Sequence, residues 1–257
     1  MAILVTGVTG LVGSRLLGRF VETGVDCRAL VRAGKQFPHG ATQVQGDLFD
    51  EESLKRAVEG VTAIVHLAAV FRTKNQDEVW RANLDGTRNL IASTGLVYNE
   101  DASRLGMEDD EVNPKLSYPA SKVAAEKELR SSGLTWSILR LTFVYGDGDE
   151  HLASTAKAAA AMKMHPAQAY SMIHQRDVAT AFELALSGAL DGLILNVADD
   201  APTTICEMAS LVGFTLDPSN EPLKNPWWGR VDASRIRSLG FTPKILTVHQ
   251  AAREGIL

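Results

Sequence analysis

The sequence predicts an α/β fold in which a doubly wound parallel sheet precedes a smaller C-terminal lobe. Apolar segments of strand length alternate with amphipathic segments of helical period up to Gly148. Repeated strand–helix–strand units of this kind build parallel sheets with helices on both faces. After Gly148 the alternation fades, and prolines interrupt the C-terminal third at positions 202, 218, 222, 226 and 243.

Length and composition limit the classes of protein. At 257 residues, of which 45% are hydrophobic, the chain can form one large domain or a domain with a smaller lobe. Its net charge of −5 argues against a surface for nucleic acid or anionic membrane. No apolar run approaches the roughly 20 residues that cross a bilayer. Strand-like residues begin at Ala2, so we expect no signal peptide and a cytoplasmic protein. Neither the two cysteines nor the six histidines have metal-ligand spacing, so we expect no metal.

The first elements are predicted from hydrophobic period and from capping residues. Ala2–Thr6 is an apolar strand, and Leu11–Glu22 has apolar residues at helical spacing up to a stop at Gly24. Strands at Cys27–Arg32 and Gln43–Gly46 follow. A helix at Glu51–Glu59 comes next, with Asp50 as its capping residue.

The next strand is predicted to be covered on both faces, because Thr62–Ala69 reads TAIVHLAA. Helices are expected at Asp77–Ile91 and Pro119–Arg130. A late strand is expected over residues 136–146, WSILRLTFVYG. Further on, Asp177 is predicted to cap a helix that follows a strand.

Three glycines at intervals of three follow the first strand, in the segment ILVTGVTGLVG. Gly7 allows a tight turn, Gly10 allows a pyrophosphate to approach the backbone, and Gly13 allows the helix to pack on the strand. The helix N-terminus offers free N–H groups and the positive end of a dipole. The spacing is GxxGxxG rather than GxGxxG, but its strand–turn–helix setting predicts a dinucleotide cradle in a Rossmann-type sheet.

The end of the second strand bears on which dinucleotide binds. Many NAD sites carry an acidic residue about 20 residues beyond the glycines, which accepts a hydrogen bond from the ribose 2′-hydroxyl. Here the segment CRALVR offers Arg32, with Arg28 on the same face of the strand. A guanidinium suits a 2′-phosphate, so NADP is the favoured cofactor and NAD the alternative.

The segment SYPASK places Tyr118 and Lys122 four residues apart, on one face of the predicted helix. The ordinary pKa of tyrosine, about 10, makes it a weak proton donor or acceptor at neutral pH. An ammonium group one turn away is expected to lower that pKa toward the working range. Upstream, the segment ASTGLVY supplies a hydroxyl, from Ser93 or Thr94, that can polarise a substrate carbonyl.

These motifs, in this order, resemble those of the extended short-chain dehydrogenases/reductases. That group includes the NAD(P)-dependent sugar-nucleotide epimerases and dehydratases and the dihydroflavonol-reductase-like enzymes. TGVTGLVG resembles the family's TGxxGxxG, STGLVY its Ser/Thr-x-x-Val-Tyr signature, and SYPASK its YxxxK. GDLFD, VHLAA, ANLDGT and LRLTFVYG resemble further landmarks, so the likeness spans nearly the whole chain.

The resemblance implies a role for each residue of a catalytic set. Tyr118 is the general acid or base, Lys122 tunes it and holds the nicotinamide ribose, and Thr94 hydrogen-bonds the substrate oxygen. Asn83 is the family's helix asparagine and completes the set. The expected cofactor contacts are Gly7, Thr9, Gly10, Leu11, Val12, Gly13, Arg32, Asp47, Leu48, Leu67, Ala68, Ala69, Leu141 and Val144, together with Tyr118 and Lys122.

This reading assigns residues 1–148 to the dinucleotide-binding Rossmann domain. Residues 149–257 form mainly a substrate-binding lobe, with 171–198 returning to the Rossmann sheet. Single departures from the family pattern are Thr94, where many members have serine, Asn99, where glycine is usual, and Leu141, where proline is frequent.

The largest departure is a shortage of residues between Ile91 and Thr94. A helix from Asp77 leads away from the cofactor edge of the sheet by about 1.5 Å per residue. A strand returns by about 3.3 Å per residue, and one or two residues cannot span that distance. We therefore predict that roughly ten to fifteen residues, a turn and a strand, are missing here. The alternative is a natural deletion that leaves a non-catalytic protein.

Three functions are consistent with these residues. The first is an NADP-dependent reductase of a small carbonyl compound, favoured by Arg32 and the short C-terminal lobe. The second is a sugar-nucleotide epimerase or dehydratase, for which Lys224, Arg230 and Arg235 are candidate phosphate contacts. The third is a dinucleotide-binding sensor, which has no need of the Thr-Tyr-Lys set. We expect a small-molecule substrate, no nucleic-acid or membrane partner, and a homodimer.

Overall fold

The structure is a computed structural model that describes residues 2–37, 40–68 and 93–257. The chain divides into two compact units. Unit 1 comprises Met1–Thr94, Lys115–Ile138 and Phe182–Leu193, and unit 2 comprises Gly95–Pro114, Leu139–Ala181 and Ile194–Leu257. The expected domain boundary after Gly148, and the return of 171–198 to the sheet, stay predictions.

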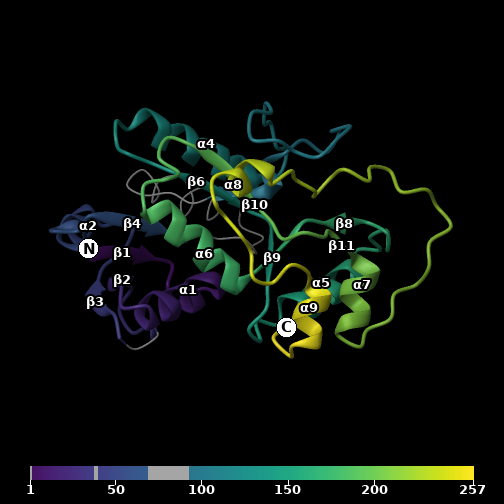
Figure 1. Ribbon diagram of the computed structural model, residues 1–257, viewed down its shortest axis with the longest axis horizontal. Coiled ribbons are helices and arrows are strands. Elements are labelled where there is room, and N and C mark those ends of the chain that lie inside the picture. The colour runs from purple at the N-terminus through teal and green to yellow at the C-terminus, as the bar shows by residue number, and fades with distance from the viewer. Residues whose placement is uncertain (1, 38–39, 69–92) are drawn as a thin grey trace. The chain divides into compact units, whose positions relative to one another are not determined.

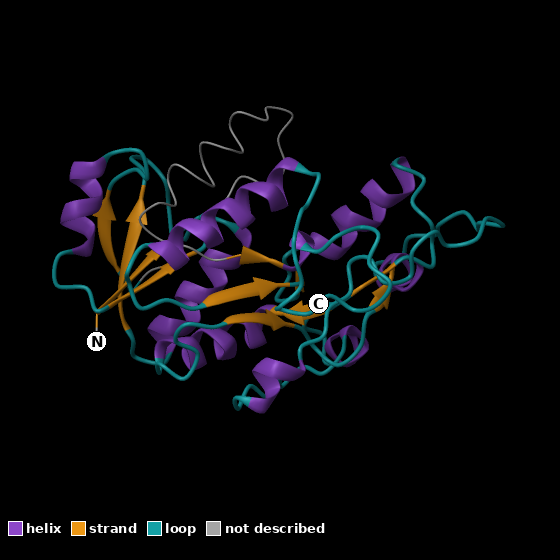
Figure 2. Ribbon diagram, turned by 90° about the horizontal axis from the view of Figure 1, so that it is seen from above, coloured by secondary structure: helices purple, strands orange, loops and turns teal. Residues whose placement is uncertain are grey.

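A parallel sheet forms the centre of unit 1 (Figure 1). Its strands lie in the order β3-β2-β1-β4 and comprise Thr42–Gln45, Asp26–Val31, Ala2–Thr6 and Ala63–His66. Every pairing is parallel, and Thr6 at the end of β1 lies opposite His66 at the end of β4. Residues that follow parallel strands are collected at one edge of the sheet, where such folds bind ligands. Figure 2 shows these strands as orange arrows next to the N-terminus, with helices beside them.

Two helices pack on this sheet and begin where the sequence predicts. The first, α1 (Leu11–Glu22), ends before Gly24, whose φ of 79° is a conformation that glycine adopts without strain. The second, α2 (Glu51–Val58), is capped by the carboxylate of Asp50. The side chains that these helices bury are Leu16, Leu17, Phe20, Leu54 and Ala57.

A third helix of unit 1 carries the YxxxK segment. It is α4 (Ser117–Ser131), which packs against the short strand β5 (Ser93–Thr94). The helix expected at Pro119–Arg130 is therefore confirmed, but it begins at Ser117. This start places Tyr118 in the first turn of the helix.

The strands expected at Cys27–Arg32 and Gln43–Gly46 each begin and end one residue earlier, as β2 and β3. Two other predicted strands differ more from the observed ones. Among the described residues, the strand expected at Thr62–Ala69 covers Ala63–His66, and Ile64 is exposed, so the expected cover on both faces is incomplete. The late strand is divided into β6 (Ile138–Leu141) and β7 (Phe143–Tyr145), which belong to different sheets. Thr142 lies between the two strands, and its N–H and its hydroxyl both donate to the carbonyl oxygen of Val197.

Unit 2 is built from short elements around an apolar core of its own, which includes Tyr145, Leu152, Met172, Met208 and Val248. Strand β7 pairs with β9 in parallel, and β8 pairs with β11 antiparallel. Strands β10 and β6 are neighbours in a further sheet. The remaining elements are η2 (Gly95–Val97), α5 (His151–Ala161), β8 (Ala169–Tyr170), β9 (Met172–His174), α6 (Gln175–Leu186), β10 (Ile194–Val197), β11 (Thr203–Thr204), α7 (Ile205–Leu211), α8 (Ser234–Ser238) and α9 (Val248–Arg253).

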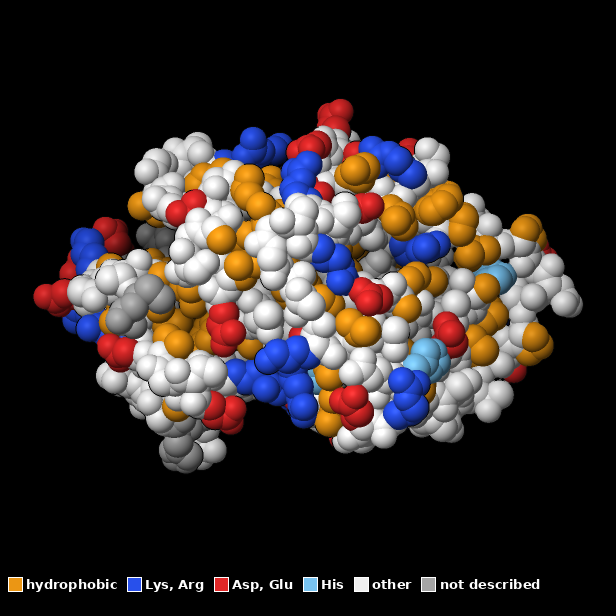
Figure 3. Space-filling view, viewed as in Figure 1, with side chains coloured by type: hydrophobic (Ala, Val, Ile, Leu, Met, Phe, Trp, Pro, Cys, Tyr) orange, Lys and Arg blue, Asp and Glu red, His pale blue; other side chains and the backbone are white. Residues whose placement is uncertain are grey.

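Some predictions fall on residues that the structure does not describe. The helix expected at Asp77–Ile91, the catalytic Asn83, the cofactor contact Ala69 and most of the junction with the predicted shortage lie outside the described ranges. Within those ranges, none of the helices has the length and hydrophobicity of a membrane span. On the face shown in Figure 3, basic and acidic side chains are interspersed.

Candidate cofactor and catalytic site

The turn between β1 and α1 has two positions at which only glycine fits. Gly7 has a φ of 73°, and a Cβ there would lie 2.5 Å from the backbone nitrogen of Ala68. A Cβ at Gly13 would lie 2.1 Å from the carbonyl oxygen of Gly7. Both separations are far shorter than a van der Waals contact, so a side chain would force the turn apart. The tight turn and the close helix–strand contact expected at these glycines therefore have a steric cause.

Gly10 has a different environment. Its N–H closes the turn by donating to the carbonyl oxygen of Gly7 at 2.9 Å, and it is the N-cap residue of α1. No side chain caps this end of α1, and its first turn contains no acidic residue. Thr9 and Leu11 are exposed and Val12 is half-buried. An uncapped helix N-terminus beside exposed backbone fits a pyrophosphate, which needs N–H donors and positive potential.

The two arginines of the second strand have different surroundings. Arg28 lies within β2, and its guanidinium donates to the carbonyl oxygen of Glu59 at 2.5 Å. Arg32 directly follows the strand and is exposed. Dinucleotide-binding sheets carry their ribose-binding residue at this strand end.

The other expected cofactor contacts lie on several loops and strands. Asp47 follows β3, and its carboxylate accepts a hydrogen bond from the N–H of Phe49 at 2.9 Å. The half-buried contacts are Leu48, Leu67 and Ala68. Leu141 in β6 and Val144 in β7 are buried. Their roles toward a cofactor stay predictions.

The Thr-Tyr-Lys set comes together within unit 1, from β5 and the first two turns of α4. The side chain of Thr94 is hydrogen-bonded to that of Tyr118. Lys122 lies one turn beyond Tyr118 and is 3% exposed. The neighbouring Ser93, the other hydroxyl that the sequence offered, donates instead to the carboxylate of Glu126.

Burial controls the protonation of this set. It raises the pKa of Tyr118 to about 12, against the effect of the hydrogen bond to Thr94. It lowers the pKa of Lys122 to about 8, against the effect of the Glu126 carboxylate. The pKa of Tyr118 thus moves in the opposite direction to the one expected from sequence, because desolvation of the phenolate outweighs the hydrogen bond to Thr94, and Lys122 is not among the groups that shift this pKa. At neutral pH Tyr118 carries its proton.

Sequence reasoning missed two buried polar residues beside this set. His66 is 1% exposed, with Nδ1 2.6 Å from the hydroxyl oxygen of Thr6, and its Nε2 has no hydrogen-bond partner among the described atoms. Burial and the ammonium of Lys122 lower the pKa of His66, so the ring is neutral. Glu126 is 3% exposed. Its spacing of four residues from Lys122 was a visible signal, whereas nothing local marks His66 beyond its polarity within an apolar strand.

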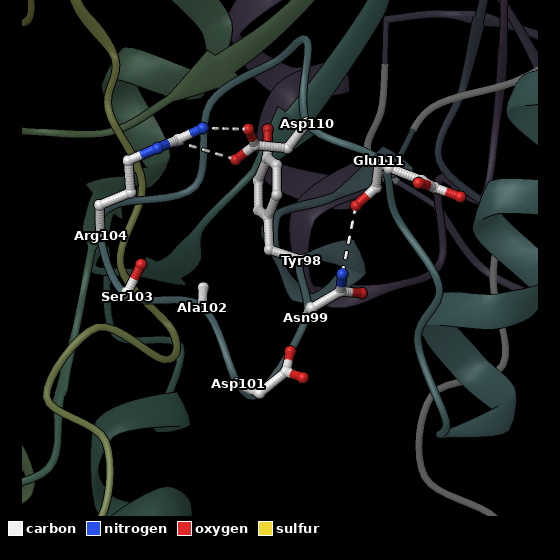
Figure 4. Close-up of a pocket in the computed structure, with 8 residues that line it drawn as sticks. All are labelled: Tyr98, Asn99, Asp101, Ala102, Ser103, Arg104, Asp110 and Glu111. Atoms are coloured by element: carbon white, nitrogen blue, oxygen red, sulfur yellow. Dashed lines mark hydrogen bonds and ion pairs between the residues drawn. The ribbon is translucent and has the colours of Figure 1, made fainter.

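A polar pocket of about 230 Å³ lies within unit 2, in the segment that follows Thr94 (Figure 4). Its lining carries three carboxylates and one guanidinium, and Arg104 is paired with Asp110 on one side of it. The amide of Asn99 donates to the backbone carbonyl of Glu111 at 3.3 Å. This excess of negative charge suits hydroxyl groups better than phosphates. The lining residues are Tyr98, Asn99, Asp101, Ala102, Ser103, Arg104, Asp110 and Glu111.

A sequence profile described as the NAD dependent epimerase/dehydratase family matches residues 3–198. The chain belongs to this family. The matched residues extend from β1 to β10 and include the glycine turn and the Thr-Tyr-Lys set. As an epimerase/dehydratase family member with reductase relatives, the chain is an NAD(P)-dependent enzyme of the extended short-chain dehydrogenase/reductase type. The resemblance stated from the motifs is confirmed.

Two relatives of this epimerase/dehydratase family member show how far the likeness extends. It is 29% identical to the Schizosaccharomyces pombe protein C2A9.02 over 240 residues, which cover 84% of this chain and 81% of that protein. It is 31% identical over 173 residues to the 4-hydroxy-2-methyl-3-oxo-4-farnesyl-3,4-dihydroquinoline-1-oxide ketoreductase of Stigmatella aurantiaca. That alignment covers 58% of this chain and 52% of the ketoreductase, so the chain spans about half of that relative's length.

Solved structures share the fold. A short-chain dehydrogenase/reductase superfamily protein from Agrobacterium tumefaciens, with bound NAD, aligns with a TM-score of 0.80 at 22% identity. The alignment covers 99% of this chain and 95% of that one. The predicted Rossmann-type α/β fold is therefore confirmed.

Proposed function

We propose that this family member reduces a small carbonyl compound with NADPH and that Tyr118 donates the proton. The observation that carries the proposal is the hydrogen bond between Thr94 and Tyr118, one turn from the buried ammonium of Lys122. These three side chains supply two hydroxyl donors and a positive charge at one place. That combination is what a carbonyl oxygen needs as it gains negative charge.

The chemistry follows from the charges. When bound, the nicotinamide supplies a hydride to the carbonyl carbon. Thr94 and Tyr118 hydrogen-bond the oxygen on which negative charge develops. Tyr118 then transfers its proton, because the substrate alkoxide is a stronger base than the phenolate that remains. Lys122 stabilises that phenolate.

The choice of NADPH rests on Arg32. Its guanidinium is exposed at the end of β2, where a 2′-phosphate is expected, and it can bind a phosphate through two parallel hydrogen bonds. The turn of Gly7, Gly10 and Gly13 would hold the pyrophosphate at the N-terminus of α1. NAD remains the alternative cofactor, as in the related structure that holds it.

A sugar-nucleotide epimerase or dehydratase is the second candidate. Its best support is Arg230, whose guanidinium lies 5.6 Å from the ring centre of Trp227 and whose Nε has no hydrogen-bond partner among the described residues. Of the other candidate phosphate contacts, Lys224 is exposed, but Arg235 is already paired with Asp109. The net negative pocket of unit 2 also disfavours a diphosphate, which is why we rank the reductase first.

The test is a steady-state screen of NADPH oxidation against aldehydes, ketones and nucleotide-sugars. We expect turnover with an uncharged ketone or aldehyde. Tyr118→Phe, which removes only the hydroxyl, should lower kcat by about 100-fold or more and leave cofactor affinity nearly unchanged. If the variant keeps most of its kcat, Tyr118 is not the proton donor. Interconversion of a nucleotide-sugar would favour the second candidate, and cofactor binding without any turnover would favour a sensor.

A further inference from the structure

The side chain of Lys122 lies in the interior of unit 1, one helix turn from a buried carboxylate, that of Glu126. Its side chain is 3% exposed, so its ammonium has lost most of its contact with water. Glu126, one turn further along α4, is equally buried at 3% exposure. The hydroxyl of Ser93 on β5 donates a hydrogen bond to the Glu126 carboxylate. Three buried polar side chains therefore follow one another in space: Ser93 on β5, then Glu126 and Lys122 on α4.

A buried ammonium needs a nearby negative charge to remain protonated. Desolvation alone favours the neutral amine, and it lowers the pKa of Lys122 to about 8 even with Glu126 present. A buried carboxylate without partners would be equally costly. The hydrogen bond from Ser93 offsets part of that cost and fixes the carboxylate on the Lys122 face of α4.

We propose that Glu126 is a positioning residue for Lys122: anchored by Ser93, its carboxylate keeps the Lys122 ammonium charged beside Tyr118. The importance of that charge for turnover rests on the proposed function. The electrostatic link between Glu126 and Lys122 does not, because it depends only on the arrangement of α4 and β5.

No other titratable group described around Lys122 provides this charge. The Lys122 ammonium lowers the pKa of His66 on β4, so that ring is neutral and supplies no charge to Lys122. Tyr118 on α4 is protonated at neutral pH, as its pKa of about 12 requires. The hydroxyl of Thr94 does not ionise. Among the described residues that act on Lys122, Glu126 is thus the one negative charge.

The direct test is an NMR titration of the whole protein labelled with ¹³C at the lysine Cε atoms. The Lys122 signal is assigned by its absence in Lys122→Arg. We expect Glu126→Gln to lower the pKa of Lys122 by about one unit or more, because an opposing charge at this range shifts a pKa by that amount. Glu126→Asp should restore most of the shift. Glu128→Gln is the matched control, since it removes the same charge from an exposed position of α4 and should leave the pKa unchanged.

Activity provides the second readout. If the ammonium is needed for turnover, the alkaline limb of the kcat/KM profile should move to lower pH in Glu126→Gln. The shift in pH units should equal the shift of the Lys122 pKa that NMR measures. An unchanged pKa of Lys122 in Glu126→Gln overturns the inference, whatever the activity. A lowered pKa without any change in the kinetic profile supports the electrostatic link and counts against the proposed function.

A variant at Ser93 keeps the test decisive if Glu126→Gln does not fold. Ser93→Ala removes one hydroxyl and leaves both charges in place. Because it frees the carboxylate from its anchor, we expect the pKa of Lys122 to fall by a smaller interval than in Glu126→Gln. If Ser93→Ala folds and the pKa of Lys122 does not move, the anchoring role is wrong.

Discussion

Arg32 is an exposed guanidinium at the strand end where dinucleotide-binding sheets contact the adenosine ribose. Arg32→Asp replaces a group that can bind a 2′-phosphate with one that can accept a hydrogen bond from a 2′-hydroxyl. We expect NADPH to bind at least about tenfold more weakly and NADH to bind as well as before or better. Fluorescence titration of both cofactors measures the two affinities.

Arg56→Asp is the control for this charge reversal. Arg56 is an exposed arginine on α2, so the variant makes the same change in net charge away from the end of β2. It should change the affinity for NADPH little. Equal affinities of the unmodified protein for both cofactors, or an unaltered preference in Arg32→Asp, would refute the assignment.

At the scale of elements, the β1–α1 turn allows a graded series of alanine variants. In Gly13→Ala the new Cβ would meet the Gly7 carbonyl oxygen at 2.1 Å, so we expect loss of stability as well as loss of cofactor binding. In Gly10→Ala the nearest atom would be 3.2 Å away, so the fold should persist while the methyl group obstructs the pyrophosphate. Thermal denaturation and cofactor titration separate the two effects.

Gly18 supplies the internal control in the same helix. It lies in the middle of α1, and a Cβ there would meet nothing within 4 Å. Gly18→Ala should therefore stabilise the protein by about 0.5–1 kcal/mol and leave cofactor affinity unchanged. If Gly10→Ala binds the cofactor as tightly as Gly18→Ala does, the turn is not a pyrophosphate cradle.

A missing strand is the second prediction at this scale. The structure describes β5 as only Ser93–Thr94, directly after the residues that it does not describe. Over its whole length, the alignment with the S. pombe protein contains gaps in this chain: 84% of 257 residues is about 216, so about 24 of the 240 aligned positions have no residue here. The ketoreductase alignment gives about the same number, since 58% of 257 residues is about 149 of 173 positions.

Sequencing of the transcript, together with the intact mass of the protein from its natural source, tests this prediction. We expect additional residues between Ile91 and Thr94, because a turn and a strand are needed to carry Thr94 back to the cofactor edge. A natural protein with the sequence analysed above would refute the prediction. It would then be expected to lack turnover while retaining the glycine turn.

For the whole molecule, Asp199 makes stability depend on pH. It is 8% exposed, and desolvation raises the pKa of its carboxyl to about 8. The unfolded chain releases this proton near the ordinary pKa of aspartate, about 4, whereas the folded chain keeps it until about pH 8. Between these values the folded state binds more protons, so the free energy of unfolding falls as the pH rises.

We expect Asp199→Asn to flatten this dependence and to raise the denaturation midpoint at pH 8 relative to the unmodified protein. Chemical denaturation between pH 5 and pH 8.5 measures it. Asp217→Asn is the control, because it removes an exposed carboxylate of unit 2 that is not among the groups that shift the pKa of Asp199. A slope that is the same in Asp199→Asn as in the unmodified protein would show that Asp199 does not titrate in this range.

The sequence by itself predicted much of unit 1. β1 and α1 have the expected bounds residue for residue, and α2 begins at the residue after its predicted cap. Hydrophobic period, glycine stops and capping side chains act over a few residues, so a single segment contains the information. The catalytic pair Tyr118 and Lys122 was predictable for the same reason, since one helix turn fixes their spacing.

Tertiary structure decided what depends on distant partners. The late strand divides at Thr142, because β6 and β7 pair in different sheets, and Asp177, expected to cap a helix, instead accepts hydrogen bonds from the N–H groups of Lys244 and Ile245. The protonation of Tyr118, the choice between Ser93 and Thr94, and the buried partners His66 and Glu126 likewise depend on packing between β4, β5 and α4. Desolvation and hydrogen bonding depend on which segments meet in space, and local sequence period does not contain that information.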